Sequence, residues 1–368
     1  MTAIEITGIR VRAALVTVRR PVKSRAGAFT QAPFLLIDLD TKGGITGRVL
    51  ACTYSRLGLK LLPPVLEDLA GFAQGSAIAV GDIPVLHDAC LKRHMFLGHE
   101  GVTQMALSMF DLAVYDALAR AAGVPLYRLI GGSADPIPAY NSCGAWLVEP
   151  AEAARDAKEL AAECGGYRHI KMRLGRESLA DDIAAIKAVR EAVGPDAMVS
   201  ADFNQGLTAS TALEVCRAID NLGLTWIEEP VVYDDYETHA RLTSKLATPI
   251  QTGEDWWSWR VGKAAIEARA CDYIMPDILR IGGITGWLRL ARFAAVASMP
   301  YSSHLSPEFS AHALAATPTR HWLEYMDWGQ DLITDPIVPE KGFVKPKETP
   351  GVGLEWNEQA VARCLIGA

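Results

Sequence analysis

Several absences in the sequence exclude whole classes of protein. No uncharged apolar run approaches the ~20 residues that a membrane-spanning helix requires. The 36 basic and 43 acidic residues form no continuous basic stripe, so nucleic acid is not an expected partner. The seven cysteines include no C-x-x-C pair, which indicates reduced packing thiols and a cytoplasmic protein. Glu5, Arg10 and Arg12 interrupt the first apolar stretch, so a secretory signal peptide is not expected either.

The composition that remains is that of a globular protein with more than one domain. At about 100–200 residues per domain, 368 residues suggest two or three domains. Residues 1–130 mix two kinds of element. β-Branched runs over 4–18 and 33–54, the second around the turn at 42–44, predict strands and a hairpin. Apolar residues at helical spacing over 102–125 predict a helix, and together these elements indicate an α+β domain.

The segment between the first two strands reads differently. RRPVKSRAGAFTQAP, residues 19–33, is basic, interrupted by glycine and proline, and without periodicity. Long loops in compact domains are candidate lids over active sites. We therefore expect a mobile loop here that covers a site.

From about Ile137 to residue 325 short apolar runs alternate with longer amphipathic stretches such as residues 178–194. An alternation of this kind is typical of a parallel barrel, and we assign residues 131–330 to a (β/α)8-type domain. The strand-like runs are IPAYNS, RHIKMR, AMVSAD, LTWIEE, TPIQTGE, CDYIMPD, MPYSSH and HWLEY.

Ionisable residues stand at or near the C-terminal ends of these runs. Consecutive members lie 20 to 31 residues apart, a spacing that fits one β/α unit. Because the active sites of such barrels lie at the C-terminal strand ends, these side chains should meet at one mouth. They are Lys171 with Arg173, Asp202, Glu228, Glu254, Asp277, His304 and Glu324.

Three successive members of this series, Asp202, Glu228 and Glu254, are acids. Side by side they would repel one another unless a cation binds or their pKa values rise. A set of oxygen ligands without Cys or His favours Mg²⁺ or Mn²⁺ over zinc. Each acid alone could instead cap the helix after its strand, but three in succession favour a metal site.

The neighbouring positions predict a base and a site for an anion. Asp277 and His304 end consecutive runs, and a carboxylate beside an imidazole fixes its tautomer and raises its basicity. Lys171 and Arg173 are two residues apart on one strand and therefore face the same side. The alternatives are a buried structural histidine and two surface cations. Taken together, the groups predict removal of the α-proton of a carboxylate substrate, with metal stabilisation of the resulting enediolate.

Motifs along nearly the whole chain resemble the mandelate racemase/muconate-lactonizing family of the enolase superfamily. The resemblance implies a (β/α)7β barrel under an α+β capping domain, with residues 331–368 returning to the cap. It also implies a Mg²⁺ enzyme acting on a 2-hydroxycarboxylate, and a homo-oligomer, an octamer in the family's namesake. The segments that carry it are IKMRLG, ADFNQG, LTWIEEP, DYETHARLTSKL, TGEDWW, MPDILRIGGITGWLRLA, SSHLSPEFSAHALAATPTRHWLE and PGVGLEW.

The same resemblance implies a role for each site residue. Asp202, Glu228 and Glu254 would bind the metal ion, and His304, backed by Asp277, would be the base for one face of the substrate. Lys171 and Glu324 would contact the substrate carboxylate. The remaining contacts implied are Asn204 with the 2-hydroxyl, and Val22, Phe29 and Tyr54 in the cap loops that close over the substrate.

One position departs from the namesake of the family. Lys171-Met172-Arg173 stands where mandelate racemase has Lys-x-Lys, so Arg173 replaces the second base. A guanidinium does not deprotonate in proteins, which argues against efficient two-base racemisation. The main hypothesis is mandelate racemase-like chemistry. The alternatives are an acid-sugar dehydratase with His304 as its single base, favoured by Lys23, Arg25 and Cys52 in the cap, and a non-catalytic carboxylate-binding barrel.

Overall fold

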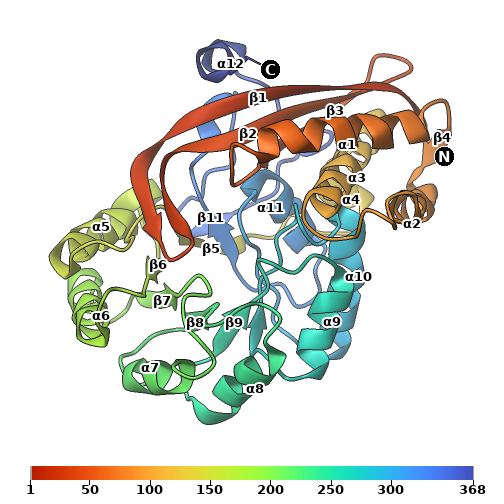
Figure 1. The fold of residues 1–368 in the computed structure, drawn as a ribbon. Coiled ribbons are helices and arrows are strands. Elements are labelled where there is room, and N and C mark those ends of the chain that lie inside the picture. The colour runs from red at the N-terminus through yellow and green to blue at the C-terminus, as the bar shows by residue number, and fades with distance from the viewer. Residues whose placement is uncertain (1, 368) are drawn as a thin grey trace.

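The computed structural model describes residues 2–367, and an antiparallel cap lies over one end of a parallel barrel (Figure 1). The cap sheet has the strand order β3-β2-β1-β4. Its apolar side packs on α3, which is buried along most of its length. The cap elements are β1 (Ala3–Ser24), β2 (Gly27–Thr41), β3 (Thr46–Cys52), β4 (Ala77–Ala79), α1 (Gly58–Ala73), α2 (Ile83–Arg93) and α3 (Val102–Ala121), with a 3-10 turn at Val80–Asp82.

The prediction of an irregular loop at residues 19–33 is wrong, because most of this segment lies in strands β1 and β2. β1 continues to Ser24 and β2 begins at Gly27, so the segment forms the end of a long hairpin. Val22 pairs with Phe29 and Lys23 with Ala28, after a register shift beyond Thr17. Cross-strand pairing supplies the backbone partners that the local sequence does not signal. The hairpin nevertheless reaches over the barrel mouth, where the lid was expected.

The barrel confirms the predicted fold class. Strands β5 to β10 lie side by side in chain order, and β11 returns to pair with β5. Their bounds are β5 (Ile137–Asn141), β6 (His169–Arg173), β7 (Met198–Asp202), β8 (Ile227–Glu228), β9 (Ile250–Thr252), β10 (Tyr273–Ile274) and β11 (Leu323–Tyr325).

The predicted strand at 299–304 is present only as isolated bridges. Tyr301 bridges Ile274 on one side and Arg320 on the other, both in parallel. Ser302 N donates to Ile274 O at 2.7 Å, and Tyr301 N donates to Thr319 O at 2.9 Å. Pro300 has no N–H to donate, which shortens the ladder. The segment still fills the gap between β10 and β11 and brings His304 to the mouth.

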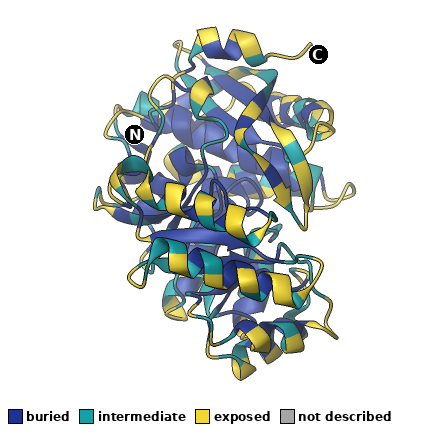
Figure 2. Cartoon of the chain, turned by 90° about the vertical axis from the view of Figure 1, so that its left-hand side faces the viewer, coloured by how far each residue is buried: buried dark blue, intermediate teal, exposed yellow. Residues whose placement is uncertain are grey.

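Helices follow the strands and cover the outside of the barrel, as the (β/α)7β pattern requires. Their outer faces are exposed while the strands inside are buried (Figure 2). They are α5 (Pro150–Ala162), α6 (Leu179–Val193), α7 (Ala212–Ile219), α8 (Tyr236–Lys245), α9 (Trp259–Glu267), α10 (Gly283–Val296) and α11 (Pro307–Ala315), with 3-10 turns at Glu163–Gly165 and Gln330–Leu332.

Buried carboxylates connect the cap to the rest of the molecule. Asp111 of α3 accepts from Thr285 N at 3.0 Å and from Thr285 Oγ1 at 2.6 Å, at the start of α10. Asp116 accepts from Arg48 N and Val352 N, and Ala14 of β1 bridges Leu365. The domain boundaries at residues 130 and 330 stay a prediction.

The remaining elements lie near the cap and at the end of the chain. They are α4 (Leu126–Leu129), β12 (Phe343–Val344), which pairs with β5, and α12 (Glu358–Cys364).

Two predictions from the sequence concern membrane-spanning helices and disulfide bonds. No helix within residues 2–367 is long and apolar enough to cross a membrane. All seven cysteines are free thiols, and five of them are buried. Packing therefore accounts for most of the cysteine content.

Candidate active site

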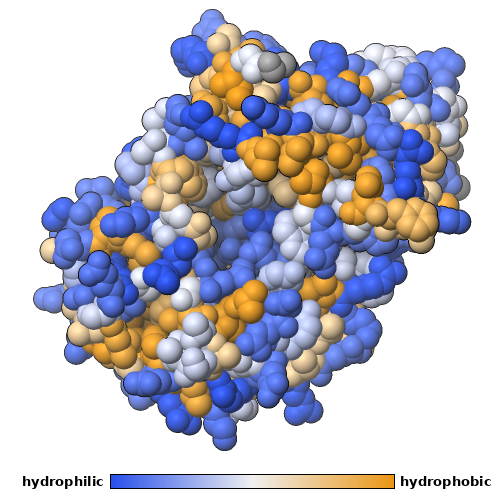
Figure 3. Space-filling view, in the orientation of Figure 1, coloured by the Kyte–Doolittle hydropathy of each residue, from blue (hydrophilic) through white to orange (hydrophobic). Residues whose placement is uncertain are grey.

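A cavity of about 240 Å³ lies between the hairpin and the barrel mouth. Figure 3 shows the molecule hollowed between the cap and the barrel on this face. The lining residues come from both the cap and the barrel, so neither part forms the cavity alone. All the predicted site residues line it except Glu228 and Asp277, which lie directly behind lining residues.

The three acids meet as their spacing predicted. Asp202 ends β7, Glu228 ends β8, and Glu254 follows β9 by two residues. Asp202 is paired directly with Glu228 in the sheet register. One carboxylate oxygen from each residue lies within 4.8 Å of the other two. Glu228 is fixed further by Trp226 Nε1 at 2.9 Å and Gln251 Nε2 at 3.1 Å, both bonded to its Oε2.

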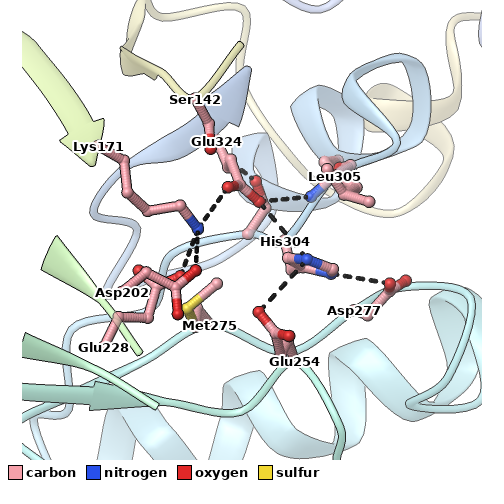
Figure 4. A network of polar contacts seen from close by, with 12 residues as sticks. Ser142, Lys171, Asp202, Glu228, Glu254, Met275, Asp277, His304, Leu305 and Glu324 are labelled. Carbon is pink, nitrogen blue, oxygen red and sulfur yellow. Dashed lines mark hydrogen bonds and ion pairs between the residues drawn. The ribbon is translucent and has the colours of Figure 1, made fainter. Parts of the chain in front are cut away.

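Lys171 points into this group from β6 (Figure 4). Its Nζ lies 2.6 Å from Glu324 Oε1 and 3.3 Å from Asp202 Oδ2, and it forms an ion pair with Glu228. Burial alone would lower the pKa of Lys171, but these carboxylates outweigh it and raise that pKa. Lys171 is therefore a fixed cation, and it can hold an anionic group at the barrel end of the cavity, which we call the floor and which is formed by the strand-end residues.

The charges at the floor do not balance. Four carboxylates, Asp202, Glu228, Glu254 and Glu324, face Lys171, Arg173 and the His304 imidazole, so one negative charge stays uncompensated even when His304 is protonated. Burial raises the pKa of Glu228 to about 8, with Lys171 opposing it, and burial raises the pKa of Glu254 to about 7. A divalent cation would offset both the charge and the burial cost. The donor set, all oxygen, fits Mg²⁺.

His304 and Asp277 form the expected pair. His304 Nδ1 lies 2.9 Å from Asp277 Oδ2, and Asp277 Oδ1 accepts from Leu279 N at 2.7 Å. Nε2 on the other side of the ring faces Glu254 Oε2 at 3.5 Å. Burial alone would lower the pKa of His304, but the charges of Glu254 and Glu324 and the bond to Asp277 raise it to about 9. With Asp277 accepting the Nδ1 proton, Nε2 is the atom turned toward the cavity.

Glu324 lies between Lys171 and His304. It is the middle residue of the last barrel strand, β11, and Leu305 N donates to its Oε2 at 3.1 Å. Burial alone would raise the pKa of Glu324, but the Lys171 and His304 charges lower it to about 2. This carboxylate holds the two cationic groups at a fixed separation.

Arg173 is anchored to the protein on the same strand as Lys171. Its Nη2 donates to Ser142 Oγ at 2.9 Å and its Nη1 to Ser142 O at 3.2 Å. The guanidinium carbon lies 4.3 Å from the centre of the Trp146 ring. Arg173 is therefore a fixed, stacked cation at the edge of the cavity.

The cap residues implied by the resemblance are all in the cavity wall. Val22 and Phe29 come from paired positions of the hairpin, and Tyr54 comes from the turn after β3. Asn204 also lines the cavity, but its Nδ2 bonds Asp202 Oδ2 at 3.0 Å. Whether Asn204 contacts a 2-hydroxyl stays a prediction. Lys23 and Arg25 instead line a separate cavity of about 590 Å³, so they do not support a polar substrate in this site.

Sequence reasoning missed several residues of the site. Ser142 directly follows β5, and the strand-end rule applied to the first barrel run would have found it. Arg280 carries no such signal, because it lies in the loop after Asp277. Trp146 and Trp328 stack with ring centres 6.3 Å apart and form an apolar wall, which residue type alone does not indicate.

Family models match both parts of the chain. Residues 6–131 match the model described as "Mandelate racemase / muconate lactonizing enzyme, N-terminal domain". Residues 152–360 match "Enolase C-terminal domain-like". Together these models cover the cap and most of the barrel.

Individual relatives extend over almost the whole chain. L-talarate/galactarate dehydratase of Salmonella typhimurium is 29% identical over 98% of this chain and 91% of its own length. A solved Bradyrhizobium enolase complexed with magnesium and mandelic acid is 41% identical, with a TM-score of 0.93 over all of both chains. An enolase from alpha pretobacterium bal199 with bound magnesium is 40% identical, with a TM-score of 0.95 over 99% of this chain and 100% of that one.

Curated relatives include racemases, cycloisomerases and acid-sugar dehydratases, so the likeness is to a set of enzymes with different products. The two family models match most of the chain, and the two solved structures share its fold from end to end. The chain belongs to the mandelate racemase/muconate lactonizing enzyme family of the enolase superfamily.

Proposed function

We propose that the protein is a Mg²⁺-dependent enzyme that removes the α-proton of a 2-hydroxycarboxylate. The observation that carries the proposal is the position of His304. Its Nδ1 is held by Asp277, while Nε2 faces the cavity beside the three-acid group. A base, a metal site and a fixed cation on one floor are the groups that α-proton removal needs.

Each group has a distinct task in this reaction. His304 accepts the α-proton at Nε2 when its imidazole is neutral, and Asp277 stabilises the imidazolium that forms. A cation held by the three acids would offset the Glu254 charge that raises the pKa of His304. Lys171 faces the negative charge that develops on the substrate carboxylate. Glu324 would have to take up a proton to hydrogen-bond that carboxylate, which the charges of Lys171 and His304 oppose in this arrangement. Asp202, Glu228 and Glu254 would hold Mg²⁺. The ion would stabilise the negative charge that develops on the substrate and so lower the pKa of the α-proton.

The wall of the cavity supports a substrate with an apolar group on its α-carbon. Phe29, Trp146, Leu305, Met326 and Trp328 form an apolar part of the wall, while Ser24, Asn204 and Arg280 line other parts of the same cavity. A buried hydroxyl without a partner costs free energy, so the apolar part disfavours a hydroxyl placed against it. The Bradyrhizobium relative was solved with mandelic acid, which has an aromatic α-substituent.

Dehydration of an acid sugar remains a second candidate because of Arg173. Its guanidinium bonds Ser142 and stacks on Trp146, and a guanidinium does not lose its proton in proteins, so Arg173 does not supply a second base. In a dehydration, loss of the C2 proton and the C3 hydroxyl gives an enol that becomes a 2-oxo-3-deoxy acid. His304 can remove the proton and return it to the leaving hydroxyl, so one base is enough.

One experiment separates these candidates. The protein with Mg²⁺ is incubated in D₂O with mandelates and with a panel of acid sugars, and NMR follows the α-proton. Deuterium entering an unchanged acid supports racemase-like chemistry, and a 2-oxo-3-deoxy product supports dehydration. Binding of the acids with neither exchange nor product would indicate a carboxylate-binding barrel and overturn the proposal.

The finer parts of the proposal concern the ion, the assembly and the location. We infer that Mn²⁺ can replace Mg²⁺, because both accept oxygen ligands. Met95, Phe96 and Leu97 follow α2 on the cap and are exposed, with Phe96 at 95%, which supports a homo-oligomer such as the octamer of the family's namesake. The free cysteines agree with a cytoplasmic location.

A further inference from the structure

Tyr54 does more than line the cavity wall. Its hydroxyl donates to Asp277 Oδ2, the same oxygen that lies 2.9 Å from His304 Nδ1. Tyr54 belongs to the cap and Asp277 to the barrel, 223 residues later in the chain. The bond is therefore a direct connection between the cap and the residue that orients the proposed base.

The cap holds Tyr54 in one backbone conformation. Its φ is +58°, a left-handed value that is costly for a residue with a large side chain. Thr53 fixes the turn on one side, since its N donates to Pro33 O at 2.9 Å and its Oγ1 to Ser55 O at 2.9 Å. A strained and well-anchored turn directs the ring to one place.

A residue of the barrel also contacts the Tyr54 ring. The Arg280 guanidinium carbon lies 4.2 Å from the centre of the Tyr54 ring, a cation–π contact. Arg280 is fixed in turn, because its Nη1 donates to Glu254 O at 2.7 Å and lies 2.5 Å from Asp255 Oδ1. The Tyr54 ring is also nearly parallel to the His304 ring, at 13° with centres 6.4 Å apart.

These contacts give the Asp277 carboxylate a donor on each oxygen besides His304. Leu279 N bonds Oδ1 at 2.7 Å and the Tyr54 hydroxyl bonds Oδ2. Burial raises the pKa of Tyr54, so its phenol keeps the proton that it donates. Two donors from different elements fix the plane of the carboxylate, and the carboxylate fixes the imidazole.

We propose that Tyr54 is a positioning residue that acts through Asp277, so that docking of the cap completes the geometry of the His304 base. The inference rests on the function proposed above, because it assigns His304 as the base. It differs from the role implied by the sequence resemblance, in which Tyr54 contacts the substrate as part of the closing loops.

The two roles separate in the kinetics of α-proton exchange. If Tyr54 acts through Asp277, Tyr54→Phe should lower kcat for exchange about tenfold and change KM and Mg²⁺ affinity less than twofold. A wall role alone would raise KM and leave kcat unchanged, which would overturn the proposal. Phe29→Leu is the matched comparison, because it alters the wall without touching Asp277, and it should move KM rather than kcat.

A double-mutant cycle tests the route of the effect. In an Asp277→Asn background, Tyr54→Phe should have almost no further effect, because the acceptor of its hydroxyl has changed. A tenfold loss that persists in that background would show that Tyr54 acts elsewhere, and the inference would be wrong. Absence of exchange in the wild type would instead contradict the proposed function itself.

A spectroscopic measurement covers the case in which the Asp277→Asn background is too slow to assay. In protein labelled with ¹⁵N-histidine, the Nδ1 proton of His304 reports its bond to Asp277. Tyr54→Phe should shift this resonance and speed its exchange with water, while Phe29→Leu should leave it in place. An unchanged resonance in Tyr54→Phe would overturn the inference, and circular dichroism checks that both variants fold.

Discussion

One side of the cavity carries charges on the ends of short parallel strands, whereas the other side covers them with apolar residues from the cap hairpin and from two barrel loops. Asp202, Glu228 and Lys171 are held by strand ladders and by one another. Val22 and Phe29 are held only by their own cross-strand pair and by packing. We keep the name floor for the strand-end residues, and we call the apolar residues above them the roof: Val22 and Phe29 of the cap hairpin, with Trp146 and Trp328 of barrel loops. Tyr54 is not counted with the roof, because its hydroxyl bonds Asp277.

This difference suggests that the floor determines the reaction and the roof determines which substrates bind. The floor has fixed charges at fixed positions, which suits a reaction whose electron flow is the same for many substrates. The roof has adaptable apolar surface, which suits selection among substituents on the α-carbon. Relatives with different product names and one fold agree with this division. Changes at the floor should therefore affect kcat, and changes at the roof should affect KM.

The largest effect is expected at the base. His304→Asn should lower α-proton exchange by about 10³-fold or more, because Arg173 cannot replace it as the base at neutral pH. Exchange is measured by NMR in D₂O with both enantiomers, and Mg²⁺ binding, which should persist, serves as the control. Rapid exchange of either enantiomer by the variant would mean that a second base exists.

The metal site should give the next largest effect. Chelation should abolish turnover and added Mg²⁺ should restore it, and Glu228→Gln should weaken Mg²⁺ binding by about 10- to 100-fold, because one of three charged ligands is lost. Calorimetry of Mg²⁺ binding measures the change, with Glu214→Gln on exposed α7 as the matched control. Full activity in metal-free protein would contradict the assignment of the floor.

A smaller effect is expected at Arg173, where the floor meets the roof. Arg173→Lys removes the planar group that bonds Ser142 and stacks on Trp146, so native activity should fall several-fold. The new amine can lose its proton, so the variant should gain exchange of the enantiomer that the wild type handles poorly. Equal exchange of both mandelate enantiomers by the wild type would show that a second base is already present.

The smallest effect should come from the roof alone. Phe29 meets Trp328 edge to face with ring centres 5.2 Å apart, so Phe29→Ala opens the wall without touching a charge. Its KM for an aromatic 2-hydroxycarboxylate should rise about three- to tenfold with kcat nearly unchanged. A fall in kcat at constant KM would show that the roof takes part in the chemistry and would break the division between the two sides.

Most of the floor could be predicted from the sequence because it follows the chain's own period. Asp202, Glu228 and Glu254 stand at or just after the strand end of successive β/α units, and parallel strands bring equivalent ends to one edge. The barrel fold class and the meeting of His304 with Asp277 followed from the same rule. Local pattern is enough where the tertiary arrangement repeats a local unit.

The roof could not be predicted in the same way, because it depends on pairs that are distant in sequence or locally unmarked. The hairpin at 19–33 forms by cross-strand pairing through a register shift, and a Gly- and Pro-containing segment gives no sign of it. Met326 and Trp328 meet Phe29 and Cys52 only after the barrel and the cap have docked.

The sequence by itself determined the barrel, the acids at its strand ends and the replacement of a second lysine by Arg173. Only the tertiary structure decided that Arg173 is fixed by Ser142 and Trp146, that Arg25 lies outside the cavity, and that Tyr54 reaches Asp277. The physical reason is that strand periodicity is a property of neighbouring residues, whereas a hydrogen bond between two domains depends on how their surfaces pack.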